Sequence, residues 1–392
     1  MNKFLQKMKL KRRWKVFLAA NHFYGNPSKK IKIIGVTGTN GKTTTATLLH
    51  QLFRNLGYKA GMIGTVVNKI NDESFDTVNT TPGPIVLNDL LSKMVEAGCE
   101  YCFMEVSSHA MDQGRVAGLI FRGGVFTNLT HDHMDYHKNF ENYFRAKKKF
   151  FKMLPRNAFA LTNIDDKYGQ KMLEGVKAKK YFYSLKNKAD FTGHLDTKLI
   201  GEFNAYNVLA IYATAVLLGQ DKEKVKEEIK KLDPAPGRFV SITSPTGVIG
   251  IVDYAHTPDA LENVLKTVNS MKGKGKVISL FGCGGDRDKT KRPIMARLGY
   301  DMSDVVILTS DNPRTEKPDN ILEDMKKGIE SLPQEKVQVI SDRRDAIKKA
   351  VSLANTGDYI LIAGKGHENY QEVNGVKNHF DDMEELKKCF NI

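Results

Sequence analysis

The segment 35–44, Gly-Val-Thr-Gly-Thr-Asn-Gly-Lys-Thr-Thr, constrains the fold of this 392-residue chain more than any other segment. It follows an apolar run at 31–36 and opens a stretch in which apolar residues recur every three or four positions up to Gly57. A strand, a glycine loop and a helix in this order are typical of a phosphate-binding loop, because glycines let backbone N–H groups approach phosphate oxygens. We therefore favour a site for ATP or a related nucleotide over a merely structural glycine turn.

The side chains of this loop have separate expected roles. Lys42 can reach the terminal phosphates, and the Thr43 hydroxyl can ligate Mg²⁺. The match to the general pattern G-x-x-x-x-G-K-[ST] is imperfect, because Val36 stands where the first glycine would be. The residues expected to surround the nucleotide are Gly38, Thr39, Asn40, Gly41, Lys42, Thr43 and Thr44.

The charge balance favours anionic partners. Lys and Arg number 60 against 45 Asp and Glu, a net charge of +15, which suits nucleotides, acidic substrates, nucleic acid or a membrane surface. Because no basic motif interleaved with aromatic residues stands out, we interpret the excess as a lysine-rich solvated surface and expect no nucleic-acid binding.

The four cysteines are too few for a disulfide scaffold in a chain of this length. Cys99 and Cys102 have C-x-x-C spacing but lack the second pair or nearby histidine of a zinc site. We expect core thiols in a reducing cytoplasm. The sequence has no long apolar stretch that could span a membrane and no cleavable signal pattern at its N-terminus. Neither feature therefore argues against this location.

Residues 1–29 form a basic leader of amphipathic character. Lysines and arginines between Lys3 and Lys15 mingle with apolar side chains such as Trp14 and Phe17. Such a segment could lie on the anionic inner face of a membrane, or it could pack its apolar side on the first domain. We favour packing and keep peripheral membrane contact as the alternative.

The remaining pattern indicates two α/β domains. From 30 to 235, short apolar runs alternate with helical stretches, as in a doubly wound fold with a parallel-rich sheet. The segment 233–238, Asp-Pro-Ala-Pro-Gly-Arg, interrupts all periodicity, so we place the domain boundary there. We expect a P-loop ATPase domain at 30–235 and a Rossmann-like α/β domain at 236–392. The strands of the second domain are expected near 248–253, 276–281, 304–309, 336–340 and 358–363.

Polar residues follow several of these strands, at the edge where parallel sheets bind ligands. Glu105 ends the strand expected at 101–106 and is a candidate Mg²⁺ ligand. In the second domain four strands end in polar clusters, which we expect to converge on one crevice. These clusters lie at 253–256, 282–287, 311–314 and 364–368.

Another polar run follows a strand expected at 124–129. Residues 131–137 contain three histidines and two aspartates, but carboxylates beside a phosphate loop suit Mg²⁺ better than zinc. We assign His133 as a metal ligand or polar contact and interpret the others as structural or surface residues. The run 147–149 of three lysines reads, on physical grounds alone, as a solvated basic face.

Together these motifs resemble the Mur ligase family, the ATP-dependent amino-acid ligases of peptidoglycan synthesis, and most nearly its members that add a diamino acid. The likeness extends in order from about 30 to 392, which makes chance negligible. It is carried by 37–44, 79–82, 104–109, 127–137, Lys147, 201–207, 237–238, 253–260, 281–293, 311–314 and 364–371.

The resemblance implies ATP and Mg²⁺ as cofactors. It implies that Lys42 and Thr43 hold the ATP phosphates and Mg²⁺, and that Glu105 and His133 bind the metal. Lys147 corresponds to the lysine that the family carbamylates, which would make it a Mg²⁺ ligand and reverses its interpretation as a solvated side chain. Asn207, Arg238 and Asp253 match nucleotide contacts.

The resemblance also implies the partners of the reaction, a muramoyl peptide and a diamino acid. The loop 311–314, Asp-Asn-Pro-Arg, matches the version associated with meso-diaminopimelate rather than lysine. Arg314 can pair bidentately with the distal carboxylate, and Glu368 can accept the distal ammonium. The other positions implied in this pocket are Asp311, Asn312, Arg292 and Gly364, and those implied to hold the muramoyl peptide are Thr80, Thr81, Ser107 and Arg115.

One departure from the family concerns its usual N-terminal domain, which grips the UDP part of the substrate. Only about 30 residues precede the first strand here. Either UDP is held differently, the carrier is another one such as a lipid, or a partner supplies the contacts. Two alternatives therefore stay open: a Mur-like ligase acting on a different acidic peptide or carrier, and a nucleotide-binding subunit without ligase activity. We expect a monomer.

Overall fold

The computed structural model describes residues 19–392, which divide into two compact units. Unit 1 comprises the chain up to Thr130 with Asn139–Leu199 and Phe203–Ala235, and unit 2 comprises His131–Lys138, Ile200–Glu202 and Pro236–Ile392. The main division thus falls between Ala235 and Pro236. The two short segments 131–138 and 200–202 group with unit 2, although the expected boundaries place them in the first domain.

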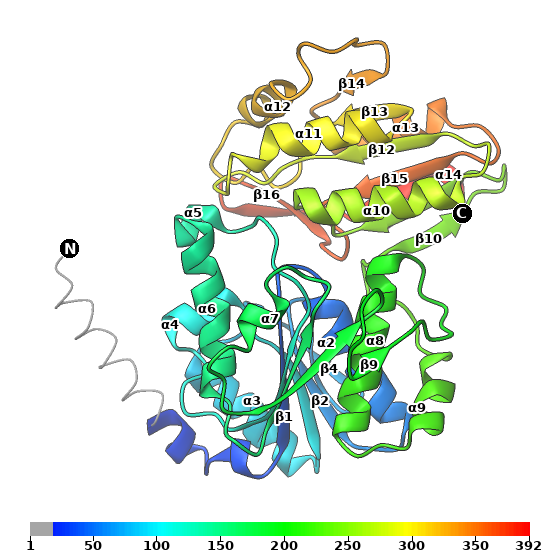
Figure 1. The fold of residues 1–392 in the computed structure, drawn as a ribbon. Coiled ribbons are helices and arrows are strands. Elements are labelled where there is room, and N and C mark those ends of the chain that lie inside the picture. The colour runs from blue at the N-terminus through cyan, green and yellow to red at the C-terminus, as the bar shows by residue number, and fades with distance from the viewer. Residues whose placement is uncertain (1–18) are drawn as a thin grey trace. The chain divides into compact units, whose positions relative to one another are not determined.

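Unit 1 is built on a nine-stranded sheet in the order β4-β3-β2-β5-β1-β6-β7-β8-β9 (Figure 1). All neighbouring pairs from β2 to β9 are parallel, whereas β3 and β4 are added antiparallel. The strands are β1 (Lys32–Thr37), β2 (Ala60–Ile63), β3 (Asn68–Ile70), β4 (Glu73–Phe75), β5 (Tyr101–Glu105), β6 (Phe121–Phe126), β7 (Phe159–Asn163), β8 (Lys179–Ser184) and β9 (Phe191–Thr192).

Three helices share a hydrophobic core with this sheet. They are α2 (Lys42–Asn55), α8 (Glu202–Leu217) and α9 (Lys222–Ile229). On α2, Leu49, Leu52 and Phe53 are fully buried in that core, and each such side chain contributes about 2 kcal/mol to the free energy of folding. The helix ends before Gly57, whose φ of 92° is the left-handed conformation that glycine adopts after a helix.

The other helical elements of this part of the chain are η1 (Pro27–Lys29), α3 (Pro84–Glu96), α4 (Ser108–Gln113), α5 (Met134–His137), α6 (Phe140–Met153) and α7 (Gly169–Met172). Phe150 of α6 packs directly on the sheet, since a Cβ at Gly35 would lie 2.4 Å from its ring and one at Gly124 2.8 Å from it. Glycine therefore lies inside β6 to make room for an aromatic ring. The strand expected at 124–129 is present, but it runs Phe121–Phe126 and so lies three residues earlier.

Unit 2 contains a six-stranded sheet in the order β10-β11-β15-β12-β13-β14. All pairs are parallel except β10 with β11. The strands are β10 (Val240–Thr243), β11 (Ile249–Asp253), β12 (Val277–Phe281), β13 (Val305–Leu308), β14 (Val337–Val339) and β15 (Tyr359–Ala363), with a separate hairpin of β16 (Tyr370–Val373) and β17 (Val376–His379). The helices are α10 (Pro258–Met271), α11 (Lys291–Met302), α12 (Pro318–Lys326), α13 (Arg343–Leu353) and α14 (Asp382–Phe390).

The expected fold class is confirmed: a P-loop α/β unit with a parallel-rich sheet, followed by a second α/β unit. The five strands expected in the second half occur within two residues of their expected bounds. The sequence analysis missed β10, β16 and β17. Their residues are largely half-buried or exposed, so they lack the continuous apolar run that marks the buried strands.

Of the leader, only residues 19–29 lie within the described part of the chain. These pack on unit 1: Ala20, Pro27 and Ser28 are buried, and Asn21 Nδ2 donates to Gly118 O at 3.2 Å. The expectations for residues 1–18 lie outside the described residues. Among residues 19–392 no helix is both long and apolar enough to cross a membrane.

Candidate active site

The phosphate-binding loop joins β1 to α2 at the carboxyl edge of the unit 1 sheet. In the part of the chain that the structure describes, no side chain caps the first turn of α2. Its N-cap, Gly41, has φ 84°, a conformation that costs glycine little. Lys42 Nζ donates to the carbonyls of Gly38 at 3.0 Å and Thr39 at 2.7 Å, so its charge lies directly over the loop. This geometry suits a phosphate at the helix N-terminus.

Neighbouring elements pack so closely on the loop that no residue larger than glycine fits at Gly38 or Gly41. A Cβ at Gly38 would lie 1.8 Å from Thr127 Oγ1, and one at Gly41 would lie 2.5 Å from Asn207 Oδ1. Thr127 Oγ1 also donates to Asn40 O at 2.6 Å. Asn207, expected to contact nucleotide, thus lies against the loop itself.

Glu105 is fully buried at the end of β5, beside the loop. Its Oε2 accepts hydrogen bonds from the hydroxyls of Thr43 and Thr65, both at 3.1 Å, and its Oε1 accepts from Thr65 N at 2.8 Å. Hydroxyl and amide donors therefore hold a carboxylate within hydrogen-bonding distance of the threonine expected to ligate Mg²⁺. Carboxylate and hydroxyl oxygens are the hard ligands that Mg²⁺ prefers.

Lys147 is buried, with 1% of its surface exposed, and its Nζ donates to Gly38 O at 2.6 Å. The interpretation of all three lysines as a solvated face was therefore wrong for this one, whereas Lys149 is exposed. On α6 the buried residues are Tyr143, Ala146, Lys147, Phe150 and Phe151. Lys147 occupies a position of the apolar stripe at helical spacing, and that periodicity was the signal that could have identified it.

The four residues implied to hold the muramoyl peptide lie together next to Glu105. Thr80 Oγ1 accepts from Thr65 Oγ1 at 3.0 Å. Thr81 Oγ1 donates to Glu105 O at 2.7 Å and accepts from Ser107 N at 3.1 Å, while Arg115 Nη1 donates to Thr81 O at 2.7 Å. Hydrogen bonds thus connect this group to the phosphate-binding loop.

The sequence analysis missed two residues that organise this edge. Thr65 links Glu105 to Thr80, and it follows the short strand β2, so its signal was a hydroxyl at a strand end. Asp165 accepts hydrogen bonds from Ser184 Oγ at 2.6 Å and Tyr206 OH at 2.7 Å. Burial raises the pKa of Asp165, but hydrogen bonds from Ser184 and its other neighbours outweigh burial and lower it to about 2. The hydrogen bond from Tyr206 anchors α8 at the residue that precedes Asn207, and so helps to position Asn207 against the loop.

His133 lies in the segment that groups with unit 2. Its backbone adopts φ 58°, its N–H donates to Asp132 Oδ1 at 2.8 Å, and its Nε2 lies 3.3 Å from Asp132 Oδ2. Its role as a ligand stays a prediction. Within residues 19–392, no group of three or more His, Cys, Asp or Glu side chains is placed to hold a metal ion.

In unit 2, Arg238 lies over the ring of Tyr254, and its charge acts on the neighbouring Asp253. Arg238 Cζ is 4.4 Å from the centre of the Tyr254 ring, and Asp253 accepts from Phe239 N and Ala255 N, both at 2.7 Å. Burial raises the pKa of the Asp253 carboxyl, and the Arg238 charge opposes that shift. A cation on an aromatic face beside a carboxylate could bind the base or ribose of a nucleotide.

Two histidines flank this cluster and stay uncharged. Burial, followed by the charge of Lys291, lowers the pKa of His256 to about 4. Burial and the charge of Arg238 lower the pKa of His367 to about 3. The chain entering unit 2 is pinned to the His367 loop, because Gly237, with φ 65°, has room for no Cβ: such an atom would lie 2.1 Å from His367 N.

The residues expected to bind the diamino acid form a second cluster, at the ends of β13 and β15. Asn312 Nδ2 donates to Glu368 Oε2 at 2.7 Å. Lys365, fully buried, lies 3.4 Å from Glu368 Oε2 and 3.9 Å from Asp311 Oδ1. Burial and the Asp311 charge raise the pKa of Glu368. Two carboxylates share one lysine here, which leaves an excess of negative charge for an incoming ammonium.

Two arginines and a glycine complete the expected pocket. Arg314, with φ 52°, donates from Nη1 to Gly285 O at 2.7 Å, and 21% of its side chain is exposed. Gly364, with φ 118°, lies against Asp311. Arg292 is fully buried and bonds Glu316 and Asp324 at 2.8–3.0 Å. Both arginines have carboxylate neighbours, since Arg314 Nε lies 3.7 Å from Glu372 Oε2. Arg314 is still partly exposed to a ligand, whereas Arg292 is fully buried in its ion pairs, and its contact with substrate stays a prediction.

The chain matches two family descriptions in sequence order. Residues 36–215 match the Mur ligase middle domain, and residues 237–366 match the Mur ligase, glutamate ligase domain. Among curated relatives, the UDP-N-acetylmuramoyl-L-alanyl-D-glutamate–2,6-diaminopimelate ligases of Bacteroides fragilis and Cytophaga hutchinsonii are each 54% identical to this chain. The alignments cover 95% of this chain and 81% and 80% of those proteins.

Solved structures agree with these matches. One of a UDP-N-acetylmuramoyl-L-alanyl-D-glutamate–2,6-diaminopimelate ligase is 37% identical, covers 92% of this chain and 78% of that chain, and gives a TM-score of 0.64. A folylpolyglutamate synthase of Mycobacterium tuberculosis, solved with ADP and AMPPCP, is 16% identical with a TM-score of 0.71, over 90% of this chain and 92% of that one. At that identity the second likeness concerns the fold alone.

Proposed function

Because this chain belongs to the Mur ligase family, we propose that it is an ATP-dependent ligase that joins meso-diaminopimelate to a muramoyl-alanyl-glutamate peptide in peptidoglycan synthesis. One observation carries the proposal: a phosphate-binding loop bonded to a buried carboxylate, Glu105, occurs in the same chain as an accessible Arg314 and a carboxylate cluster around Glu368. The first activates an acid, and the second recognises a zwitterionic amine. We place the reaction in the cytoplasm, where ATP is supplied.

The reaction proceeds in two steps. A carboxylate oxygen of the acceptor attacks the terminal phosphorus of ATP, so that an acyl phosphate forms and ADP leaves. The diaminopimelate amine then attacks the acyl carbon, phosphate leaves, and the amide forms with loss of one proton. Lys42 and the N-terminus of α2 stabilise the negative charge that builds up as two anions approach, so catalysis rests mainly on positioning and electrostatics.

The residues beside the loop fit Mg²⁺. Glu105 and Thr43 offer hard oxygen ligands, and Mg²⁺ supplies a Lewis acid that neutralises charge on the phosphates. Lys147 is proposed to be carbamylated: its neutral amine adds to CO₂, an N–C bond forms and one proton is released. The carbamate keeps an N–H for Gly38 O and gains an anionic carboxylate, which is also a hard ligand. His133 is the remaining proposed ligand.

The two ends of diaminopimelate are proposed to be read by opposite charges. Arg314 pairs with the distal carboxylate in the planar geometry that favours a guanidinium. Glu368 and Asp311 attract the distal ammonium, and the shared charge of Lys365 keeps them from repelling each other outright. Lysine lacks the distal carboxylate, so it would leave Arg314 without its partner.

The test is phosphate release by the purified chain with Mg²⁺, ATP and UDP-N-acetylmuramoyl-alanyl-glutamate, comparing meso-diaminopimelate with lysine. We expect release only when nucleotide, acceptor and amino acid are all present, and much faster release with diaminopimelate. Release without any acceptor would contradict the ligase proposal. Release with lysine alone would contradict the assignment of Arg314, and release only with a lipid-linked acceptor would move the proposal to another carrier.

A further inference from the structure

The sheet of unit 1 has a second edge, opposite the one that carries the phosphate-binding loop. Strand pairing places Lys32 beside Tyr101, Ile33 beside Phe121, and Phe159 beside Lys179. The first residues of β1, β5, β6, β7 and β8 therefore begin together at the amino edge of the sheet. The sequence analysis assigned this edge no role.

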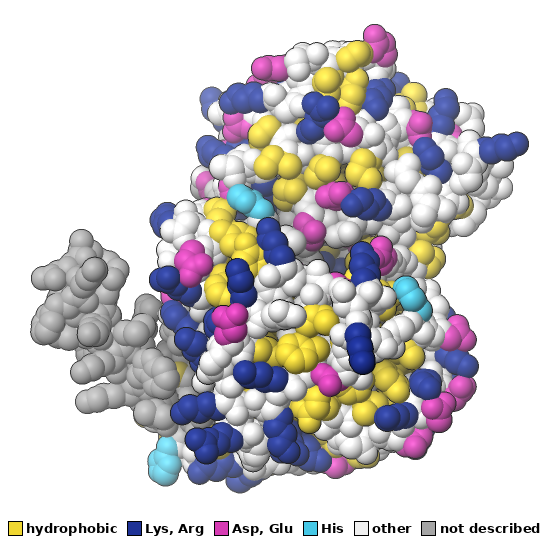
Figure 2. Space-filling model, in the orientation of Figure 1, with side chains coloured by type: hydrophobic (Ala, Val, Ile, Leu, Met, Phe, Trp, Pro, Cys, Tyr) yellow, Lys and Arg dark blue, Asp and Glu magenta, His cyan; other side chains and the backbone are white. Residues whose placement is uncertain are grey.

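Exposed basic side chains gather on this edge. We call them the amino-edge surface: Lys29, Lys30, Lys32, Lys59, Arg122, Arg156, Lys177 and Lys179. The exposed acids at this edge are Asp72, Glu73, Glu96, Glu100 and Glu174. Of these, Asp72 is paired with Arg54 at 2.7 Å. Figure 2 shows Lys and Arg side chains gathered along the margin of unit 1 at which β1 begins in Figure 1.

Backbone contacts hold the turns of this surface next to one another. Glu100 O accepts from Lys32 N at 2.9 Å, and Glu100 N donates to Lys59 O at 2.9 Å. Arg122 Nη1 donates to Asn157 O at 3.1 Å. Lys179 N donates to Ala158 O at 2.9 Å. Positive charge is therefore concentrated over adjacent turns of a rigid sheet edge.

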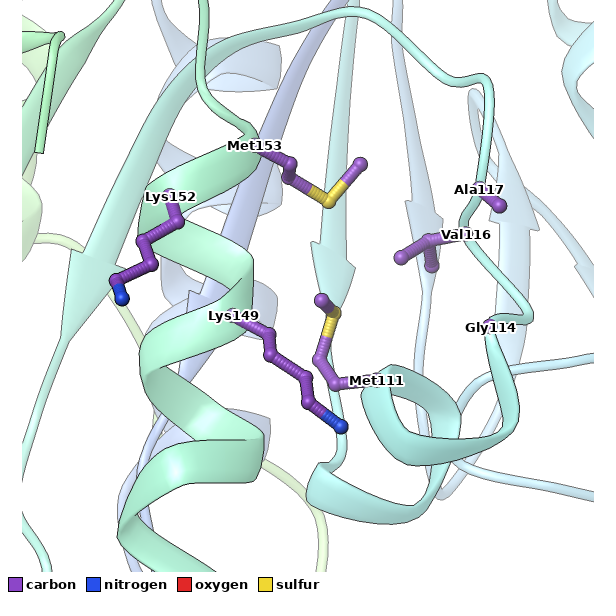
Figure 3. Close-up of a pocket in the computed structure, with 7 residues that line it drawn as sticks. All are labelled: Met111, Gly114, Val116, Ala117, Lys149, Lys152 and Met153. Atoms are coloured by element: carbon purple, nitrogen blue, oxygen red, sulfur yellow. The ribbon is translucent and has the colours of Figure 1, made fainter. Parts of the chain in front are cut away.

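Apolar side chains interrupt the basic ones. Phe23 is 83% exposed and Ile120 is 44% exposed, and Asn21 bonds Gly118, which brings their two segments together. A cavity of about 300 Å³ is lined by residues that shortly precede Ile120 and Arg156 in the sequence (Figure 3). Its walls are apolar, and it is lined by Met111, Gly114, Val116, Ala117, Lys149, Lys152 and Met153.

The sequence that enters this face has the same character. Residues 1–18 contain seven Lys and Arg and no Asp or Glu, together with Trp14 and Phe17. They join the described chain at residue 19, two positions before Asn21. Residues 1–18 therefore carry the same sign of charge as the amino-edge surface.

We propose that the amino-edge surface docks on an anionic lipid bilayer. Each lysine or arginine that faces an anionic membrane surface adds to the free energy of binding. Exposed Phe and Ile side chains add to it by burying apolar surface in the interfacial region of the bilayer. Nucleic acid would use the same positive charge, but it offers no apolar phase for Phe23, Ile120 and the Met-lined cavity. Docking by this edge leaves the phosphate-binding loop, at the opposite edge of the same sheet, facing water and its soluble nucleotide.

The test is sedimentation of the full chain with vesicles of phosphatidylcholine containing about one third phosphatidylglycerol, compared with vesicles of phosphatidylcholine alone. We expect binding to the anionic vesicles only, weakened by salt. Replacing Lys29, Lys30, Arg156 and Lys177 by Gln should weaken binding about tenfold or more. The matched control replaces four exposed lysines elsewhere, Lys188, Lys222, Lys224 and Lys274, and should bind as the parent does.

A second variant, Phe23→Ser, tests the apolar contribution at unchanged charge and should weaken binding several-fold. Phosphate release in solution should be unchanged in all variants, which shows that they are folded. Equal loss in the patch and control variants would overturn the proposal, because net charge alone would then explain binding. So would binding to single-stranded nucleic acid that exceeds and displaces vesicle binding, or a patch variant that binds as tightly as the parent.

Discussion

The carboxyl edges of the two sheets hold charge in different ways. In unit 1 a single buried carboxylate, Glu105, is surrounded by hydroxyl and amide donors, and the loop beside it is shaped by glycines. In unit 2, two carboxylates, Asp311 and Glu368, share the charge of one buried lysine, Lys365. Unit 1 should therefore be sensitive to changes of shape, and unit 2 to changes of charge and pH.

The largest effect should come from the shape of the loop. Gly38→Ala would place a methyl group 1.8 Å from Thr127 Oγ1, so the loop must move away from its phosphate-binding position. We expect turnover to fall by about 10³-fold, measured as phosphate release. Gly83→Ala is the control, because a Cβ there would meet no described atom within 4 Å. Equal activity of both variants would show that the loop tolerates displacement.

A smaller effect should follow from removing the buried amine of unit 1. Lys147→Ala should lower turnover about 10²-fold, while Lys149→Ala, at an exposed position of the same helix, should leave it unchanged. A short carboxylic acid added to Lys147→Ala should restore part of the rate if the missing group is a carbamate. Partial rescue by an alkylamine instead, with none by carboxylates, would mean that Lys147 acts as an ammonium.

Charge in unit 2 should control the choice of amino acid. Arg314→Leu removes a bidentate partner worth about 2 kcal/mol, so kcat/KM for diaminopimelate should fall roughly 30-fold. The kcat/KM for free lysine as the amino-acid substrate should not fall. Arg297→Leu, which removes an exposed arginine paired with Asp301, is the control for loss of charge. A parallel fall for both amino acids would remove Arg314 from the distal site.

The smallest effect should be a difference in acid sensitivity. The pKa values of His256 and His367 lie at about 4 and 3, below the ordinary value near 6.5. Between pH 6.5 and 4 the unfolded chain therefore binds protons that the folded unit does not, so stability falls as pH falls. From pH 7 to 5 we expect a loss of about 2 kcal/mol for each histidine.

Among its described residues, unit 1 has one comparable histidine, His50, whose pKa is lowered to about 4 by burial and by the charge of Lys69. Hydrogen exchange at pH 5 and 7, analysed by unit, should show the greater loss of protection in unit 2. Replacing His256 by Gln should make the stability of unit 2 depend less steeply on pH. Equal losses of protection in both units would contradict the greater pH sensitivity expected of unit 2.

Much of the architecture could be predicted because buried parallel strands leave apolar runs. The strands that contain Tyr101 and Ile360 were found this way, and so was Glu105, since a carboxylate that ends such a run has few structural explanations. The exposed hairpin of β16 and β17 left no such run. Residues 123–124 gave a misleading signal, because glycine breaks a strand pattern in the sequence. In the structure Phe159 of β7 occupies the space beside Gly123, and Phe150 of α6 that beside Gly124.

The candidate site was harder to predict where a side chain acts against its usual chemistry. Lys147 looked like one of three solvated lysines, and only its register with Tyr143 and Phe150 marks it as buried. Thr65 follows a strand of four residues, too short to stand out. The pairing of Lys365 with both Asp311 and Glu368 joins segments about fifty residues apart, and no local pattern contains that information.

The close approach of Gly237 to His367 has a mechanical consequence. No side chain separates the first residues of the second unit from the loop 364–368, and Phe239 N is bonded to Asp253 two residues further on. A displacement of the loop that carries Glu368 would therefore press directly on the backbone of Gly237. Under the proposed function, a diamino acid held at Glu368 would also bear on 237–239, the residues that follow the boundary at Ala235.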